Sequence, residues 1–434
     1  MKKSIYISIV AIVVIAAIAL YYIRSITVTP PPQKITVKVG IIMPLTGAFA
    51  LFGQDTSRGV LTAISMFNEK QLIPGVEVVP VVADSQSSPT VAASEAERLI
   101  TVEKVDIVIG SYAGSLAMAI SGVCEKYNVP FYEVIAAPNE LTMNRGYKWV
   151  FRFGPAGLYY GYAAVDFLMD FAKKMKWDVG SLKIAVVHED SAYGTSCADG
   201  DVDRLKYYGI TPVTRERYSA ATTDLSSLIM KLKSLGVDVV LITSYASDAQ
   251  LFLKQSYELG FKPKLIIGHS AGFELPATAQ AVGDLIKGVF VVGFPLYGMN
   301  TKGLSPSVQN DIAEFTEYYK KKYEGALPAS WGAKAFSATY HVFLKGVLKI
   351  ALEKYGKIDR ETIRKAFLDV DIPEGGTFVG FGVKFAPPDS PFSGENLRAT
   401  THPVCEWFGT KAEDLKAVWP SSLAVTEPQY IPRP

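Results

Sequence analysis

Short apolar runs alternate with longer segments of helical period along most of the chain from Lys34 onward. Runs such as IVIG at 107–110 and VVLIT at 239–243 are almost continuously apolar and rich in β-branched residues. Strands buried on both faces have this composition, and their alternation with helices is typical of parallel sheets covered by helices on both sides. The chain is therefore predicted to have an α/β fold.

The same pattern places the individual elements. The expected strands lie at 37–43, 76–84, 107–110, 131–135, 183–188, 213–218, 239–242, 265–268 and 289–293. The expected helices lie at 55–68, 89–102, 116–127, 159–176, 193–208, 225–235, 246–259, 307–323, 333–354 and 360–368. Because the series restarts near Gly154, we expect two doubly wound lobes. Ligands bind such sheets at the carboxyl ends of the strands, so the loops that follow the strands are the places to search for a site.

The N-terminus has a pattern of its own. Lys2 and Lys3 precede an uncharged apolar run at 5–23, which is long enough to cross a bilayer as a helix of about 20 residues. The positive flank would stay in the cytoplasm, so the rest of the chain is expected to be exported. We predict a transmembrane anchor at 1–24 and a stiff, proline-rich linker at 25–34. A cleaved signal peptide is the alternative; it would have a shorter apolar core and a small-residue cleavage site, and would leave the protein periplasmic or secreted.

Composition narrows the function. A chain of 434 residues fits two domains, and a net charge of +2 without basic runs gives no indication of nucleic-acid binding. The cysteines are too few for a disulfide framework, and the sequence does not say which of them could pair: Cys124, Cys197 and Cys405. The histidines do not have the spacing of metal ligands: His188, His269, His341 and His402. No phosphate-binding glycine loop is present, so no metal or cofactor is expected.

One motif is typical of an enzyme. Residues 268–272, GHSAG, form a GxSxG pattern directly after an expected strand, as in the nucleophile elbow of α/β-hydrolases. Chain order would allow a triad of Ser270 with His402 and an acid, for which the candidates are Asp311, Asp359 and Asp371. Pro276 interrupts the helix that should support the serine, and no HGGG-type oxyanion loop lies upstream. We therefore expect this loop, with His269 and Ser270, to lie at the edge of a binding cleft and not to be catalytic.

Four aromatic residues stand within a few residues of expected strand ends: Phe52, Tyr112, Tyr193 and Tyr245. At those places a ring can face the space between two lobes and line a small-molecule pocket. Small residues at 113–115 and 135–137 would let backbone N–H groups and hydroxyls approach a ligand. The expected helix start near Leu116 favours a negatively charged group there, such as a carboxylate.

Several segments in order resemble the leucine/isoleucine/valine-binding proteins of ABC transporters: KVGIIMPLTGAFALFGQDTSRGVLTAI, DIVIGSYAGS, NVPFYEVIAAPNELT, IAVVHEDSAYGTSCA and VDVVLITSYASDAQLFLKQSYELGF. The resemblance extends from Lys34 to about Pro420. It implies the type I periplasmic binding fold, in which two lobes are joined by three crossings of the chain and close around a ligand. The lobes would comprise residues 35–155 with 295–380 and residues 156–294 with 381–434.

The resemblance also implies roles for particular residues. Phe52 matches an aromatic residue that contacts the ligand, and residues 112–114 (Tyr112, Ala113 and Gly114) match the loop that binds an amino acid's carboxylate. Ala136 and Ala137 match a loop that contacts the amino-acid head group. Tyr193 and Tyr245 match aromatic residues of the second lobe that cover the ligand.

Some positions depart from the family pattern. Gly114 stands where the family usually has serine, with Ser115 next to it, and Ala137 stands where threonine is usual. Ser270 stands in the loop that usually supplies an acid for the ligand's ammonium. Since a buried ammonium without a partner is unfavourable, Glu133 is the alternative acid.

We therefore predict a substrate-binding protein of an ABC importer, located outside the cytoplasmic membrane and acting with membrane permease subunits. A branched-chain or related amino acid is the expected ligand, and an amide, a carboxylate or an aromatic acid is the alternative. A sensory receptor ectodomain is a second alternative, although no second apolar span follows within the sequence. A serine hydrolase using Ser270 is the third.

Overall fold

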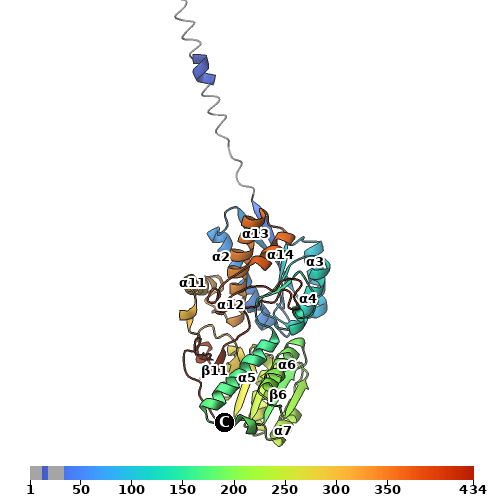
Figure 1. Ribbon diagram of the computed structural model, residues 1–434, viewed down its shortest axis with the longest axis vertical. Coiled ribbons are helices and arrows are strands. Elements are labelled where there is room, and N and C mark those ends of the chain that lie inside the picture. The colour runs from blue at the N-terminus through green and yellow to red at the C-terminus, as the bar shows by residue number, and fades with distance from the viewer. Residues whose placement is uncertain (1–11, 18–33) are drawn as a thin grey trace, which may run out of the picture.

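A computed structural model describes residues 12–17 and 34–434 of the chain. From Lys34 onward the chain forms two α/β lobes stacked along the long axis of the molecule (Figure 1). The transmembrane anchor predicted at 1–24 and the linker at 25–34 fall, apart from 12–17 and Lys34, outside the described residues. Among the helices that are described, none combines the length and the apolar character needed to cross a bilayer.

The first lobe is built on a sheet of five parallel strands in the order β2-β1-β3-β4-β5. These strands are β1 (Ile35–Met43), β2 (Val76–Asp84), β3 (Ile107–Gly110), β4 (Phe131–Glu133) and β5 (Val150–Arg152). The last residues of three neighbouring strands, Gly110, Glu133 and Arg152, stand side by side in register. The loops that follow these strands therefore leave the sheet together at one edge.

The second lobe is built on a sheet of seven strands in the order β12-β11-β10-β9-β8-β6-β7. These strands are β6 (Ile184–Glu189), β7 (Thr214–Tyr218), β8 (Val239–Thr243), β9 (Leu265–His269), β10 (Phe290–Val292), β11 (Val404–Trp407) and β12 (Leu415–Trp419). Strands β6 to β10 are parallel, and β11 and β12 add an antiparallel edge. The predicted parallel α/β architecture is confirmed, with this edge as an addition.

Helices cover both faces of each sheet (Figure 1). In the first lobe they are α2 (Ala50–Lys70), α3 (Pro89–Thr101), α4 (Gly114–Lys126), α11 (Pro306–Lys322), α12 (Ser330–Ser337), α13 (Leu348–Tyr355) and α14 (Arg360–Asp369). In the second lobe they are α5 (Gly157–Lys174), α6 (Ala192–Tyr207), α7 (Ser226–Ser234), α8 (Ala246–Glu258), α9 (Ala271–Glu274) and α10 (Pro276–Val282). Short 3-10 turns connect several of them, and a π-helical segment, Ala338–Val347, lies between α12 and α13.

The side chains of β1 point alternately to the two faces of the sheet, and both faces are buried. Val39 and Ile41 pack into a cluster with residues of α2, α12 and α14, whereas Ile42 packs on the other side with residues of α3 and α4. Successive side chains of a strand point to opposite faces, so both faces need apolar residues. The cluster that contains Ile42 continues across the junction of the lobes into the second sheet.

The chain passes between the lobes three times. It leaves the first sheet after β5, returns after β10 to form α11–α14, and enters the second sheet again at β11. Before this last passage the segment 394–396 lies beside the first sheet, where Gly394 accepts a hydrogen bond from the N–H of Arg152 and Glu395 forms a bridge with the same residue. The exact division of the chain into lobes stays a prediction.

All three cysteines are buried and free. The sequence does not say which of them could pair, and the structure contains no bridge between Cys124, Cys197 and Cys405.

Candidate ligand-binding site

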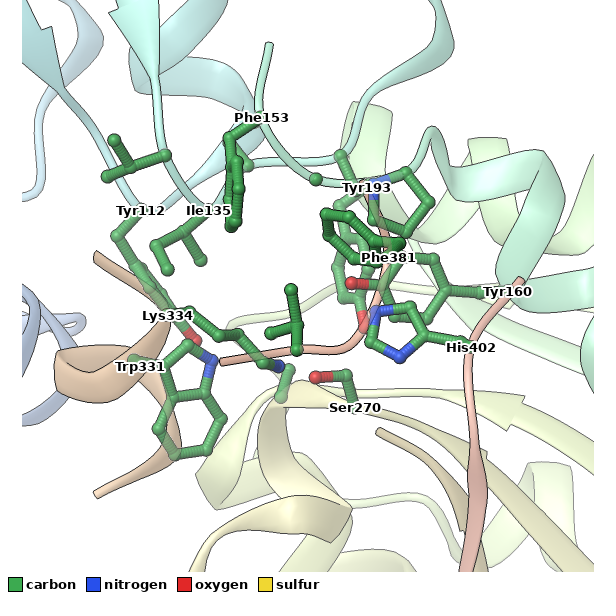
Figure 2. Close-up of a pocket in the computed structure, with 18 of the residues that line it drawn as sticks. Tyr112, Ile135, Phe153, Tyr160, Tyr193, Ser270, Trp331, Lys334, Phe381 and His402 are labelled. Carbon is green, nitrogen blue, oxygen red and sulfur yellow. The ribbon is translucent and has the colours of Figure 1, made fainter. Parts of the chain in front are cut away.

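A cavity with an empty volume of about 580 Å³, including space open to solvent, lies between the two lobes (Figure 2). Its walls come mainly from loops that follow the carboxyl ends of the strands, as expected for doubly wound sheets. The lining residues are Tyr112, Gly114, Val134, Ile135, Ala136, Ala137, Phe153, Gly154, Pro155, Tyr160, Tyr193, Tyr245, Ser270, Ala271, Trp331, Lys334, Val379, Phe381 and His402.

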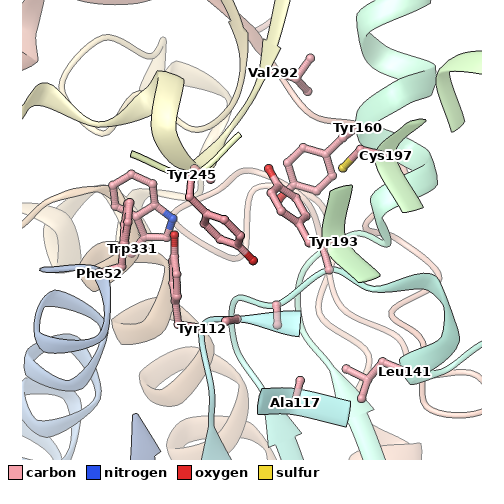
Figure 3. Close-up of a cluster of buried hydrophobic side chains, with 14 of the residues drawn as sticks. Phe52, Tyr112, Ala117, Leu141, Tyr160, Tyr193, Cys197, Tyr245, Val292 and Trp331 are labelled. Atoms are coloured by element: carbon pink, nitrogen blue, oxygen red, sulfur yellow. The ribbon is translucent and has the colours of Figure 1, made fainter. Parts of the chain in front are cut away.

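The wall from the first lobe begins with Tyr112, in the loop between β3 and α4. Its backbone has a φ of +80°, a left-handed conformation that is unfavourable for a residue with a bulky side chain. Phe52 supports the ring from behind: the two rings are stacked with centroids 4.7 Å apart. Trp331 of α12 packs edge-on against Phe52 at 5.0 Å, and Figure 3 shows these three rings as one group beside Tyr245.

Glu133 fixes the loop that follows β4 by hydrogen bonds. Its carboxylate accepts hydrogen bonds from the Ser111 hydroxyl at 2.8 Å and from the N–H groups of Ile135 and Ala136 at 2.8 and 2.7 Å. Burial raises the pKa of Glu133, and these hydrogen bonds act in the opposite direction. Glu133 therefore holds the loop that lines the cavity, whereas its own side chain does not line it.

Tyrosines dominate the wall from the second lobe. Tyr193, in the first turn of α6, donates a hydrogen bond from Oη to the carbonyl oxygen of His269 at 2.9 Å. Its ring lies 5.8 Å from that of Tyr245 and 6.4 Å from that of Tyr160. Burial raises the pKa of all three phenols well above the usual value, so that they remain neutral hydrogen-bonding groups.

The loop after β9 closes the bottom of the cavity. Ser270 and Ala271 both have positive φ angles, +29° and +28°, and strained backbone of this kind is often found at functional sites. The Ser270 hydroxyl donates a hydrogen bond to the carboxylate of Glu274. His269 itself points away from the cavity and contacts Thr243 at 2.9 Å and Asp201 at 3.1 Å.

An ion pair joins the two lobes beside this loop. Lys334 of α12 places Nζ 3.3 and 3.4 Å from the two carboxylate oxygens of Glu274 of α9. Both residues are buried, and Lys334 lines the cavity above Ser270 (Figure 2). A buried charge is tolerated only with a partner, so the lysine and the glutamate stabilise each other across the junction of the lobes.

Two polar atoms of the lining residues are buried without a partner among the described residues: Tyr112 Oη and His402 Nδ1. Burial lowers the pKa of His402 well below its usual value, and the nearby Lys334 ammonium lowers it further. The imidazole is therefore neutral. Unpartnered buried polar atoms are rare in proteins and indicate a place where a bound molecule can supply the missing hydrogen bond.

The hydrolase triad considered from the sequence is not assembled. The single hydroxyl proton of Ser270 is donated to Glu274, and Nδ1 of His402 has no partner. The candidate acids are engaged elsewhere: Asp311 with His341 and Lys345, Asp359 with the start of α14, and Asp371 with Lys384 and Arg398. As expected from Pro276, the helix after Ser270 ends at Glu274.

The structure gathers seven of the twelve sequence-predicted residues around the cavity: Tyr112, Gly114, Ala136, Ala137, Tyr193, Tyr245 and Ser270. The others stand behind them, with Phe52 under Tyr112, Glu133 under its loop, Ala113 and Ser115 at the start of α4, and His269 under Tyr193. Sequence reasoning missed Trp331, Lys334 and His402 as lining residues. A lysine in the otherwise uncharged and mainly apolar segment SWGAKAFS is a signal that could have indicated the first two.

The fold and the cavity together define a two-lobed receptor for a small molecule. A family model described as periplasmic binding protein matches residues 36–394, and the chain belongs to this family. The Leu/Ile/Val-binding protein homolog 7 of Brucella abortus (strain 2308) is 37% identical over 398 residues, which cover 91% of this chain and 94% of that protein. The predicted family resemblance is thereby confirmed. Binding proteins of this family bind small molecules outside the cytoplasm.

Solved structures share the fold at lower identity. The substrate-binding protein LivJ of Streptococcus pneumoniae, in complex with isoleucine, has a TM-score of 0.69 and 19% identity, and the match covers 88% of this chain and 98% of that one. A solute-binding protein of an ABC transporter from Rhodopseudomonas palustris BisB5, in complex with 3,4-dihydroxy benzoic acid, has a TM-score of 0.66 and 19% identity, with coverage of 86% and 93%.

Proposed function

We propose that this protein is the substrate-binding protein of an ABC importer and that it captures a small organic carboxylate in the cavity between its lobes. The observation that carries the proposal is the cavity wall itself. It combines aromatic rings from both lobes with a few polar groups, among them Lys334. Ligand pockets have this composition, with apolar walls for affinity and few polar groups for orientation.

The sequence predicts a branched-chain or related amino acid as the solute. The fold alone does not decide between ligand classes, since relatives in fold carry isoleucine in one case and 3,4-dihydroxy benzoic acid in another. Both molecules share a carboxylate and an apolar or aromatic body. A cavity with one lysine and several tyrosines suits those two shared features.

Delivery to permease subunits is the second part of the proposal. A binding protein held close to its permease by the predicted anchor at 1–24 would have a high effective concentration there. Fractionation of cells that express the full chain tests the anchor: the protein is expected in the membrane fraction and not in the soluble extracytoplasmic fraction. Recovery of a shortened, soluble form would instead support a cleaved signal peptide.

Binding itself is tested by thermal unfolding of the exported part, residues 34–434, in the presence of amino acids, amides, short carboxylates and aromatic acids. A ligand at about 100 times its Kd stabilises the folded state by about 2.7 kcal/mol, which is easily measured as a rise in Tm. Saturable stabilisation by at least one carboxylate is expected. Failure of every compound in such a panel would contradict the proposal, and labelling of Ser270 by a serine-hydrolase probe would favour the hydrolase alternative.

A further inference from the structure

We propose that the preferred ligand is a carboxylate with an apolar or aromatic body and no ammonium group, because the protein supplies its own ammonium to the site through Lys334. This inference rests on the proposed function and names the ligand class of the same cavity. The ligand proposed here therefore differs from the amino acid that the sequence predicts.

Charge in the cavity wall is the first support. Of the described residues that line the cavity, Lys334 is the cationic one and none is acidic. The two carboxylates that contact the lining loops after β4 and β9 already have partners: Glu274 is bonded by Ser270 and Lys334, and Glu133 by Ser111 and two backbone N–H groups. A ligand ammonium would therefore lie beside a like charge, with no carboxylate among the described lining residues to bind it.

The geometry of Lys334 is the second support. Charge-assisted hydrogen bonds between ammonium and carboxylate are usually about 2.7–2.9 Å long, whereas Nζ lies 3.3 and 3.4 Å from the Glu274 oxygens. An ammonium has three donors, and Glu274 is its one hydrogen-bonding partner among the described residues. Lys334 thus retains donor capacity on the side of the cavity.

The unpartnered polar atoms are the third support. Tyr112 Oη can donate to a carboxylate, and the neutral His402 ring offers Nδ1 as a further hydrogen-bonding atom. The start of α4 also reaches the cavity at Gly114, and the first N–H groups of a helix have no partner within the helix. These groups together suit an anion, while Phe153, Trp331 and the tyrosines suit its apolar body.

Matched compounds test the inference, since each pair differs only in the ammonium group. The pairs are 3-phenylpropanoate with phenylalanine and 4-methylpentanoate with leucine, and isothermal titration calorimetry on the exported part measures the affinities. The deaminated acids are expected to bind about tenfold tighter or more, which corresponds to about 1.4 kcal/mol. Tighter binding of the amino acids would overturn the inference and leave the proposed function intact. Binding of no member of either pair would overturn the inference, and the proposed function would then fail if the wider panel also gave no binding.

Variants separate the charge from the shape. Lys334→Met combined with Glu274→Gln removes both charges, so that neither remains buried alone; we expect this variant to fold with a normal circular dichroism spectrum and to lose about tenfold or more in affinity for the acid. The single Lys334→Met variant leaves the Glu274 carboxylate available to a ligand ammonium, and is expected to shift preference toward the amino acid of each pair.

Lys349→Met, on the exposed surface of α13, is the matched control, for which we expect unchanged affinity. Unchanged affinity for the acid in the folded double variant would overturn the inference.

Discussion

At the scale of single residues, the aromatic rings of the cavity wall connect the two lobes. Tyr245 shows this: its ring lies 4.8 Å from Phe49 of the first lobe and 5.8 Å from Tyr193 of its own lobe. Aromatic pairs contribute about 0.5–1.5 kcal/mol beyond the area they bury. Tyr245 therefore connects the lobes and covers the cavity at the same time.

Replacement of this ring is expected to weaken binding. Tyr245→Ala removes a wall of the cavity and should reduce affinity for the preferred carboxylate about tenfold or more, or about 1.4 kcal/mol. Titration calorimetry measures the effect, and circular dichroism checks the fold. Tyr207→Ala, at an exposed position of α6, serves as the control. Wild-type affinity in the Tyr245 variant would place the binding site elsewhere.

A buried acid near Tyr245 should make stability depend on pH. Burial raises the pKa of Asp248 to about 7, although Tyr218 donates a hydrogen bond to its carboxylate at 2.7 Å. The unfolded chain has the lower pKa, near 3.8, so the folded state binds more protons between these values. Stability from this group is therefore present below pH 4 and is lost as the pH rises to about 7.

Thermal unfolding of wild type and Asp248→Asn between pH 4 and pH 8 checks this. The asparagine variant lacks the titrating group, so its Tm should fall less than that of the wild type as the pH rises. Parallel pH profiles for the two proteins would show that Asp248 titrates normally.

At the scale of elements, helix α12 decides what the cavity presents, because it carries both Trp331 and Lys334. Its start is fixed by α2: Asp55 accepts hydrogen bonds from the N–H groups of Ala329 at 3.1 Å and Gly332 at 2.5 Å. The two helices also approach closely at glycines. A Cβ added at Gly59 would lie 2.0 Å from the carbonyl oxygen of Gly332.

A larger residue at the contact between α2 and α12 should destabilise the protein and weaken ligand binding. Gly59→Ala forces the backbones of α2 and α12 apart and is expected to lower the free energy of unfolding by about 1–3 kcal/mol, and to weaken ligand binding because Lys334 moves with α12. Chemical denaturation and calorimetry measure the two effects. Gly303→Ala, where an added Cβ meets open space, should leave both unchanged. A stable Gly59→Ala protein would show that the helices separate without strain.

Elements differ in how well sequence predicts them. The strands 76–84 and 107–110 have the predicted bounds because long or fully buried apolar runs are distinctive. Strand β5, with three residues, is too short to show a period, so the sequence pattern does not predict it. The helix predicted at 333–354 is divided by the π-helical segment 338–347, since side-chain periodicity does not distinguish a slightly widened turn from a regular one.

The local sequence also predicts only part of the site. Tyr112, Tyr193 and Tyr245 could be predicted because they follow strands, and strand ends of parallel sheets meet at one edge. Trp331 and Lys334 come from a helix far along the chain that reaches the cavity only through its packing on α2. The pairing of Lys334 with Glu274 depends on the arrangement of the two lobes, which the local sequence does not encode.

At the scale of the whole molecule, the two lobes are in contact around the cavity. Contacts between Phe49 and Tyr245 and between Lys334 and Glu274 connect the lobes at the cavity. Three passages of the chain join the lobes, so a hinge motion that separates them would open the cavity without breaking either sheet. Binding of a solute would favour the closed arrangement because the ligand contacts both walls.

The most direct test is an electron-density map of the protein crystallised with the tightest-binding carboxylate from the panel. Density for the compound should lie between the two sheets, with its carboxylate at Lys334 and Tyr112 and its body among the tyrosines. Density outside this cavity, or a carboxylate directed away from Lys334, would contradict the proposed binding site.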